Sequence, residues 1–276
     1  MLCQGLVRKK GSERRWVASQ RHQCDLGRCA DAQREPPVVG ARVDVEQRTS
    51  LAVRSHRKLE KQRGQAPADS RNRQLNAVLQ TLAASIDTRD PLTAGHSEKV
   101  TEYASGICSE LNLTNDACET IRVAAMLHDY GKIGVPDAIL KKPGRLTKEE
   151  YDIVKTHAMK SRDILTQINF SGSLRRVPEI AGAHHEKIDG SGYPLGLKGD
   201  QIPLGAKIIA VADFFEAITA KRHYRDPLPL ETAFDLLEKE SGVHFEPHIV
   251  EAFVRFYQKA NPNHHIDGLT KMKKVS

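Results

Sequence analysis

Seven side chains that commonly ligate metals lie on, or at the end of, stretches with helical periodicity. This feature constrains the chain most. In each stretch apolar residues recur every three or four positions, as in a helix that packs one face against a core. Packed helices hold imidazole and carboxylate groups in fixed directions around a bundle interior. The five histidines and two aspartates concerned are His96, His128, Asp129, His157, His184, His185 and Asp213.

This set of side chains suits two metal ions better than one. Imidazoles combined with a bridging carboxylate favour iron, manganese or zinc. Seven ligands are too many for one ion, but they suffice for two ions that share Asp129. Considered alone, His128 would more often be a core histidine whose ring nitrogens are hydrogen-bonded. The presence of the six other candidate ligands favours the metal site. The residues therefore predict a two-metal centre inside a helical bundle.

The apolar spacing predicts an all-α domain without internal repeats. Thr114 is expected to cap one helix, and Thr147-x-x-Glu150 is a capping box that opens another. Gly131 is expected to end the helix that reaches His128, and Gly242 to end a later one. No alternation typical of strands persists after residue 70. Helices are expected around 75–86, 100–111, 118–127, 147–157, 178–185, 204–220, 230–240 and 247–260.

The basic charge of the chain belongs to its N-terminal segment. Residues 1–80 contain 17 Lys and Arg against 8 Asp and Glu, whereas the remainder contains 25 against 27. Such a segment can contact nucleic acid or an anionic surface. It lacks interleaved aromatic residues, so we expect a poorly structured, linker-like extension and no nucleic-acid partner. We place the extension at residues 1–70, the folded domain at 71–262 and a tail at 263–276.

Composition narrows the cellular setting. No run of 18 apolar residues is present, so no membrane-spanning helix is expected. The start of the chain lacks the apolar core of a signal peptide. Five scattered cysteines make no disulfide framework, which fits a reducing cytoplasm.

Several motifs give the chain a family resemblance. They are Arg89-Asp90-Pro91 with Gly95-His96-Ser97, His128-Asp129-x-Gly131-Lys132, His184-His185-Glu186-x-x-Asp189-Gly190-x-Gly192-Tyr193-Pro194, and Val211-Ala212-Asp213 with Tyr224-Arg225. Residues 72–260, about two-thirds of the chain, resemble the HD-GYP family of the HD-superfamily metal-dependent phosphohydrolases. Members of that family hydrolyse the bacterial second messenger cyclic di-GMP to linear pGpG, and in many cases on to GMP.

The resemblance implies a binuclear centre with iron or manganese, or else zinc or magnesium. A hydroxide between the two cations is the implied nucleophile for attack on phosphorus. Leu92 stands where some members carry a glutamate that supports a third metal, so two ions are expected. The implied ligands are His96, His128, Asp129 and Asp213 for one ion, and His157, His184 and His185 for the other, with Asp129 bridging.

Four further residues are implied to contact substrate. Lys132 resembles the cation that contacts the scissile phosphate; otherwise it is a solvated lysine at a helix C-terminus. Arg222 and Arg225 match positions that grip phosphate, or they form a solvated basic loop. Tyr193 is implied to shape the guanine pocket and serve partner contacts, or it only packs its loop.

The sequence departs from the family pattern at positions that are not ligands. Ala158 and Ser161 replace the proline and glycine that commonly follow the motif histidine. Every expected ligand of the binuclear centre is present. The chain is therefore interpreted as a cytoplasmic bacterial phosphodiesterase for cyclic di-GMP. Diguanylate cyclase (GGDEF) proteins and a second copy of the chain are its candidate partners.

Two alternatives stay open. One is an HD hydrolase that acts on another nucleotide or cyclic dinucleotide. The other is a non-catalytic module that binds cyclic di-GMP or a diguanylate cyclase domain.

Overall fold

The computed structural model describes residues 74–89, 95–221 and 226–262, which all belong to one unit of the chain, Leu59–Ser276. Within these ranges the regular structure is helical and there is no β-strand, while an isolated parallel bridge pairs Ser241 with Phe245. The expected all-α class is confirmed. The predicted extension at 1–70 and the tail at 263–276 lie outside the described residues, and the predicted domain limits stay a prediction.

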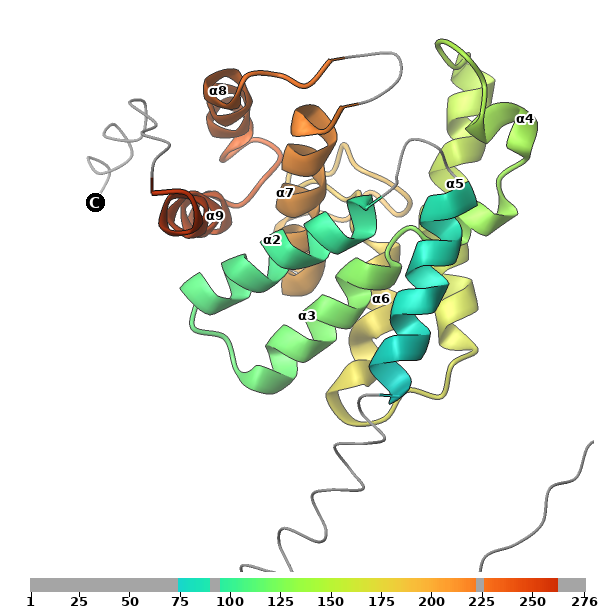
Figure 1. The fold of residues 1–276 in the computed structure, drawn as a ribbon, viewed down its shortest axis with the longest axis horizontal. Helices are drawn as coiled ribbons and strands as arrows, with labels where there is room; N and C mark the ends of the chain where they lie inside the picture. Colours follow the sequence, from blue (N-terminus) through green and yellow to red (C-terminus); the bar gives the residue numbers. More distant parts are fainter. Residues whose placement is uncertain (1–73, 90–94, 222–225, 263–276) are drawn as a thin grey trace, which may run out of the picture. The chain divides into compact units, whose positions relative to one another are not determined.

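The helices are joined by loops, of which the one over residues 183–198 is long (Figure 1). In chain order they are a helix over 74–89, α2 (His96–Glu110), α3 (Asn115–Leu127), the 3₁₀ helix η1 (Tyr130–Gly134), α4 (Asp137–Leu140), α5 (Lys148–Thr166), η2 (Gly172–Arg176), α6 (Val177–Gly182), η3 (Gly199–Gln201), α7 (Leu204–Thr219), α8 (Leu230–Glu240) and α9 (Pro247–Ala260).

The helix starts predicted from capping residues are confirmed. The Thr147 side chain accepts a hydrogen bond from the Glu150 backbone N–H at 3.2 Å, and the Glu150 carboxylate accepts one from the Thr147 N–H at 2.7 Å. Thr114 caps α3 by accepting from Ala117 N at 3.3 Å. Gly242 follows α8 with a φ of 79°, a conformation that glycine adopts without steric cost. The short α4 was not predicted, because two prolines flank it.

The role predicted for Gly131 is wrong. α3 ends at Leu127, and Gly131 lies inside η1. A Cβ atom on Gly131 would lie 2.0 Å from the His157 carbonyl oxygen and 2.4 Å from the Ser161 nitrogen. Glycine is thus required because α5 passes directly against η1. Ser161 completes the junction: its hydroxyl donates to the His128 carbonyl at 2.6 Å and accepts from the Gly131 N–H at 2.8 Å.

α7 is the central helix, because its apolar residues are buried nearly all round. It packs against α2, α3, α6, α8 and α9. In Figure 1, α8 and α9 lie to one side of α7, and α4 and α5 lie to the other. An aromatic cluster joins α7 to its neighbours: Phe215 lies 4.7 Å from Phe253 and 4.8 Å from Phe234 between ring centroids. Tyr103 of α2 lies 5.4 Å from the Phe253 ring.

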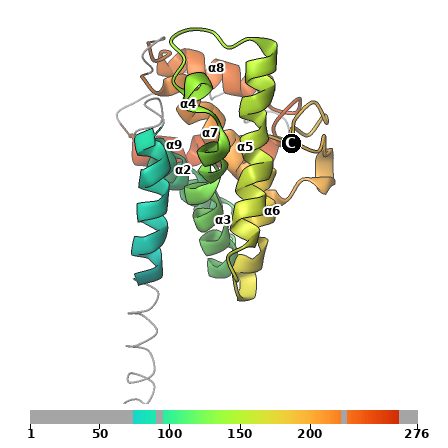
Figure 2. The same cartoon turned by 90° about the vertical axis from the view of Figure 1, so that its right-hand side faces the viewer.

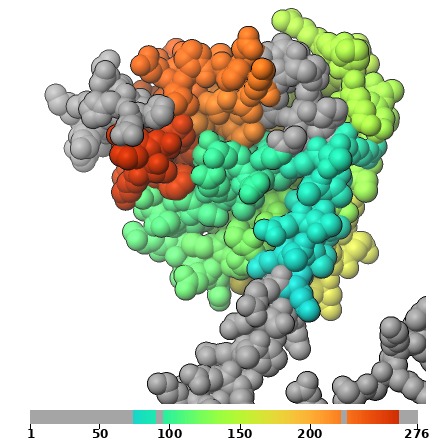
Figure 3. Space-filling view, in the orientation of Figure 1, coloured from blue at the N-terminus to red at the C-terminus, as the bar shows by residue number. Residues whose placement is uncertain are grey.

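The helix over 74–89 lies on the surface of this bundle. The space-filling view shows it beside α2 and α3 (Figure 3). After a quarter turn, α3 lies between this helix and α5 (Figure 2). Leu79, Ala83 and Ile86 are the buried side of the helix. Among the described residues, none of the helices has the length and apolar character needed to cross a membrane.

The capping box at the start of α5 makes a first prediction. Replacing Thr147 by alanine leaves the Glu150 N–H without its acceptor, so the free energy of unfolding should fall by about 1 kcal/mol. Urea denaturation followed by circular dichroism measures this loss. The matched control is Thr147→Ser, which keeps the hydroxyl and should stay close to the wild type. An alanine variant as stable as the serine variant would contradict the prediction.

Candidate metal centre

The seven side chains singled out in the sequence come together at one place in the bundle. They arrive from α2, the end of α3, α5, the end of α6, and α7. Three groups have potential ligand atoms that all lie within 4.8 Å of one another: His157 with His184 and His185, His96 with His128 and Asp213, and His128 with Asp129 and His184. Their function as ligands stays a prediction, but their convergence is a feature of the fold.

Asp129 lies between the two halves of this cluster. One carboxylate oxygen, Oδ1, is 3.2 Å from His157 Nε2. The other, Oδ2, is 3.5 Å from His96 Nε2 and 3.6 Å from His128 Nε2. Asp213 lies on the side of His96, with 3.4 Å between Asp213 Oδ1 and His96 Nε2. Each oxygen of Asp129 therefore faces a different set of imidazoles.

Backbone carbonyls fix three of the imidazole rings. His128 Nδ1 bonds to the Ala125 carbonyl at 2.6 Å, and His157 Nδ1 bonds to the Val154 carbonyl at 2.7 Å. His184 does the same with the carbonyl three residues before it, at 2.5 Å. A carbonyl can only accept, so Nδ1 carries the proton in each ring. The Nε2 atoms of the three rings point into the cluster, as metal coordination requires.

His96 is oriented by a residue that the sequence did not single out. Its Nδ1 lies 2.5 Å from Glu216 Oε2, and both side chains are buried. Glu216 is three positions after Asp213 on α7, so both carboxylates lie on the same face of that helix. This spacing was the only local signal for Glu216, since 120 positions separate it from His96. Glu216 positions His96.

Burial and neighbouring charges set the pKa values within the cluster. Burial lowers the pKa of His128 to about 4 and that of His184 to about 3. These imidazoles are neutral and able to coordinate. Burial alone would raise the pKa of Asp129, but the Lys132 ammonium and the neighbouring imidazoles hold it well below its usual value. Burial alone would lower the pKa of His96, but hydrogen bonds to Asp129 and Glu216 raise it to about 10.

Two basic groups hold the loop that follows the metal cluster. Lys132 extends its ammonium to within 2.8 Å of Asp129 Oδ2. Arg89, at the end of the first helix, donates to the Asp137 carboxylate at 2.7 and 3.0 Å and to the Val135 carbonyl at 2.9 Å. It also donates to the carbonyls of Lys132 and Ile133. Arg89 was noted as part of a motif without a role, and it clamps the segment that carries Lys132.

Glu186 holds the glycine-rich loop in a similar way. Its buried carboxylate accepts from the backbone N–H of Leu195 at 2.7 Å and of Leu197 at 2.9 Å. A Cβ on Gly192 would lie 2.5 Å from the Glu186 Cα atom, so glycine is needed where the loop folds back. The loop thereby places the Tyr193 ring 4.7 Å from that of His185.

The predicted substrate residues are only partly described by the structure. Tyr193 packs against His185 and, at 6.5 Å between ring centroids, against His157. Burial raises the pKa of Tyr193, and a hydrogen bond with the Tyr151 side chain adds to the effect. Arg222 and Arg225 lie outside the described residues, as does Leu92.

The donor set and its burial together fit divalent cations. A family model described as HD domain matches residues 80–249. This chain belongs to the HD domain family. The resemblance identified from the sequence motifs is thereby confirmed, and the metal dependence expected of HD phosphohydrolases agrees with the histidine and aspartate cluster.

Curated relatives of this HD domain protein carry the names expected for the HD-GYP subgroup. The "Cyclic di-GMP phosphodiesterase" of Thermotoga maritima is 45% identical over 178 residues, which cover 64% of this chain and 48% of that protein. A "Probable cyclic di-GMP phosphodiesterase" of Vibrio cholerae is 39% identical, covering 66% of this chain and 44% of that protein. The "3'3'-cGAMP-specific phosphodiesterase 3" of the same organism is 40% identical, covering 63% and 37%. The chain thus spans less than half the length of each of these relatives.

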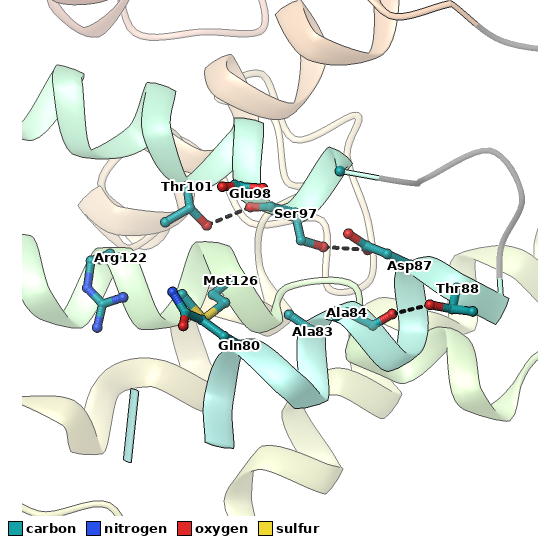
Figure 4. A pocket seen from close by; sticks show the side chains of 11 residues that line it. Gln80, Ala83, Ala84, Asp87, Thr88, Ser97, Glu98, Thr101, Arg122 and Met126 are labelled. Atoms are coloured by element: carbon teal, nitrogen blue, oxygen red, sulfur yellow. Dashed lines mark hydrogen bonds between the residues drawn. The ribbon is translucent and has the colours of Figure 1, made fainter. Parts of the chain in front are cut away.

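A separate cavity of about 510 Å³ lies between the first helix, α2 and α3 of the HD domain (Figure 4). None of the seven clustered residues lines it. The buried Asp87 at its edge accepts a hydrogen bond from the Ser97 hydroxyl at 2.8 Å, as the dashed line in Figure 4 shows. This bond ties the first helix to the residue that follows His96. The cavity is therefore distinct from the metal cluster.

Glu216 provides the prediction for this centre. Replacing it by glutamine keeps its size but removes the charge that orients His96, so metal affinity should fall about 10- to 100-fold. Competition against a chromophoric chelator measures this affinity without any substrate. Glu238→Gln, on the exposed face of α8, is the matched control and should bind metal like the wild type. Equal affinities in the two variants would show that Glu216 does not act on the metal site.

Proposed function

We propose that this chain hydrolyses cyclic di-GMP with two divalent metal ions held by the seven clustered residues. The position of Asp129 carries the proposal, because its Oδ1 faces His157 while its Oδ2 faces His96 and His128. A carboxylate in that position can bridge two ions. The names of the relatives from Thermotoga maritima and Vibrio cholerae support cyclic di-GMP as the substrate.

The proposed division of ligands follows the two halves of the cluster. His96, His128 and Asp213 would hold one ion, and His157, His184 and His185 would hold the other. Asp129 would serve both. Five imidazoles among seven donors favour iron, manganese or zinc over magnesium, which prefers oxygen ligands. Iron and manganese are our first expectation.

The metals, when bound, would neutralise charge on the phosphate and lower the pKa of water to near 7. The chain's own groups do the rest. Lys132 is 14% exposed, and its ammonium stands beside Asp129 at the edge of the cluster. From there it can contact a phosphate oxygen of the scissile bond. Arg222 and Arg225 are proposed to grip the phosphates from the loop after α7.

The reaction adds one water molecule across one phosphodiester of the cyclic substrate. The bond between phosphorus and a 3′ oxygen breaks, and linear pGpG with a 5′ phosphate and a free 3′ hydroxyl is formed. A second cleavage would give GMP. The predicted diguanylate cyclase partner, homodimer and cytoplasmic location stay predictions.

A second candidate substrate is 3'3'-cGAMP. The relative that is named as specific for this molecule is 40% identical to the chain, close to the identities of the two cyclic di-GMP phosphodiesterases. Identity alone therefore does not separate the two substrates. A non-catalytic module that binds a cyclic dinucleotide is the third candidate. Turnover of a cyclic dinucleotide would exclude it, and binding without turnover would favour it.

Metal content combined with turnover tests the proposal. Protein purified without oxygen should contain two metal ions per chain and convert cyclic di-GMP to pGpG, as separated by chromatography. Asp129→Asn keeps the shape of the side chain but removes its charge. It should lose metal, and its turnover should fall about 100- to 1,000-fold, the order of the loss expected when charge stabilisation of a transition state is removed. Asp116→Asn, on the exposed first turn of α3, is the matched control.

The outcomes separate the three candidates. Faster turnover of 3'3'-cGAMP than of cyclic di-GMP would reassign the substrate. Two bound metals and tight cyclic dinucleotide binding without any cleavage would favour the non-catalytic module. Full activity in Asp129→Asn would overturn the proposed ligand set.

A further inference from the structure

An aromatic and basic patch adjoins the metal cluster on its α5 side. We call Tyr151 and Lys155 the α5 rim. The two residues are four positions apart on α5 and therefore lie on the same face of the helix. The Lys155 ammonium lies 4.8 Å from the centre of the Tyr151 ring and 5.9 Å from that of Tyr193. The rim thus continues the surface that Tyr193 begins.

The α5 rim is one side-chain layer away from the clustered histidines. The Tyr193 ring packs on His185 at 4.7 Å, and Lys155 lies on the Tyr193 ring. A nucleotide with its phosphate at His157, His184 and His185 would extend its base across this layer. Tyr151 is 47% exposed, so its ring is available to a ligand. The capping box at Thr147 fixes the turn that carries it.

Apart from the hydrogen bond between the Tyr151 and Tyr193 side chains, the local contacts of the rim contribute little to the fold. Lys155, which is partly exposed, pairs with the exposed Asp152 at 2.7 Å. Exposed pairs of this kind contribute little to stability. A large aromatic ring left half exposed in the first turn of a helix also contributes little to the core. Its chemistry instead matches a purine ring, which stacks on aromatic side chains.

We propose that the α5 rim binds a purine base of the substrate, with Tyr151 stacking on the base and Lys155 donating to its acceptor atoms. This inference rests on the proposed function and deepens it. Guanine presents two adjacent acceptors, O6 and N7, whereas adenine presents N7 beside an amino donor. An ammonium group therefore favours guanine. Tyr151 binds either purine, and Lys155 selects guanine over adenine.

Inhibition of a small diester substrate tests this assignment. Bis(p-nitrophenyl) phosphate has no purine, so its hydrolysis reports the centre alone. GMP, AMP and inorganic phosphate are the competing inhibitors. In Tyr151→Ala the inhibition constants of GMP and AMP should both rise about tenfold, as expected for loss of one stacked base. In Lys155→Met only the constant of GMP should rise, again about tenfold, so that discrimination between GMP and AMP is lost. Inorganic phosphate should inhibit all variants equally.

Three controls keep the test specific. Tyr151→Phe and Lys155→Arg keep the ring and the charge, and should retain most of the inhibition by GMP. Lys99 of α2 makes comparable contacts with residues that follow it: it pairs with Glu102 at 2.7 Å and lies 5.4 Å from the Tyr103 ring. Lys99→Met should leave the constants for all three inhibitors unchanged.

The inference is wrong if GMP inhibits Tyr151→Ala and Lys155→Met as strongly as the wild type. Equal weakening of the inhibition by GMP, AMP and phosphate would also contradict it, because that result would indicate damage to the metal centre. If the wild type cleaves the small diester but not cyclic di-GMP, cyclic di-GMP is not the substrate. The comparison of inhibitors then still tests whether the α5 rim binds a purine. If neither diester is cleaved, the proposed function fails, and calorimetric titration of GMP and AMP into the same variants judges the rim.

Discussion

The buried carboxylate of Asp129 is the interaction on which the rest of the site depends. An ionised carboxylate inside a protein costs several kcal/mol unless nearby cations and hydrogen bonds compensate for it. Here Lys132 lies 2.8 Å from one oxygen, and imidazoles face both. The pKa of His96 is raised for the same reason. A proton on that ring places positive charge next to the carboxylates of Asp129 and Glu216. Divalent cations in this position would take over the function of that proton. The cluster is therefore arranged around a need for positive charge, which binding of metal would satisfy.

The geometry around that carboxylate is fixed mainly by backbone. His128, His157 and His184 each use the carbonyl three residues earlier to hold the Nδ1 proton, so their orientation follows directly from helical structure. The ring of His96, the first residue of α2, is held by Glu216 instead. Packing then holds the helices together at short range. The contact of α5 with η1 at Gly131 admits no side chain, and Ser161 bonds to both ends of that turn. A displacement of α5 would thus move His157 relative to Asp129.

Local pattern in the sequence predicted most of the longer helices and the residues that converge in the cluster, although α5 continues to Thr166, beyond the predicted range 147–157. Periodicity and caps predicted α8 and α9 at their observed limits, and the motif histidines converge as expected. The residues that position the cluster and its loops could not be predicted, for a physical reason. Arg89 acts on a carboxylate 48 positions away, and Glu216 acts on a ring 120 positions away. Contacts between residues so far apart in the chain cannot be predicted from the spacing of neighbouring residues. Gly131 was misjudged for a related reason: a helix-ending glycine and a glycine required by close packing look the same until the packing partner is known.

Substrate choice must be decided outside the metal cluster. The clustered histidines and aspartates would act on phosphate, and the phosphodiesters of cyclic di-GMP and 3'3'-cGAMP are chemically alike. Relatives named for these two substrates are 45% and 40% identical to the chain, so a shared catalytic centre is compatible with different bases. The difference between guanine and adenine lies at the edge of the ring, where a donor replaces an acceptor. Only side chains that reach the base can detect it. In the described part of the chain, Tyr193 packs on His157 and His185, and the α5 rim adjoins Tyr193. Selectivity can therefore change through this surface while the residues around Asp129 stay the same.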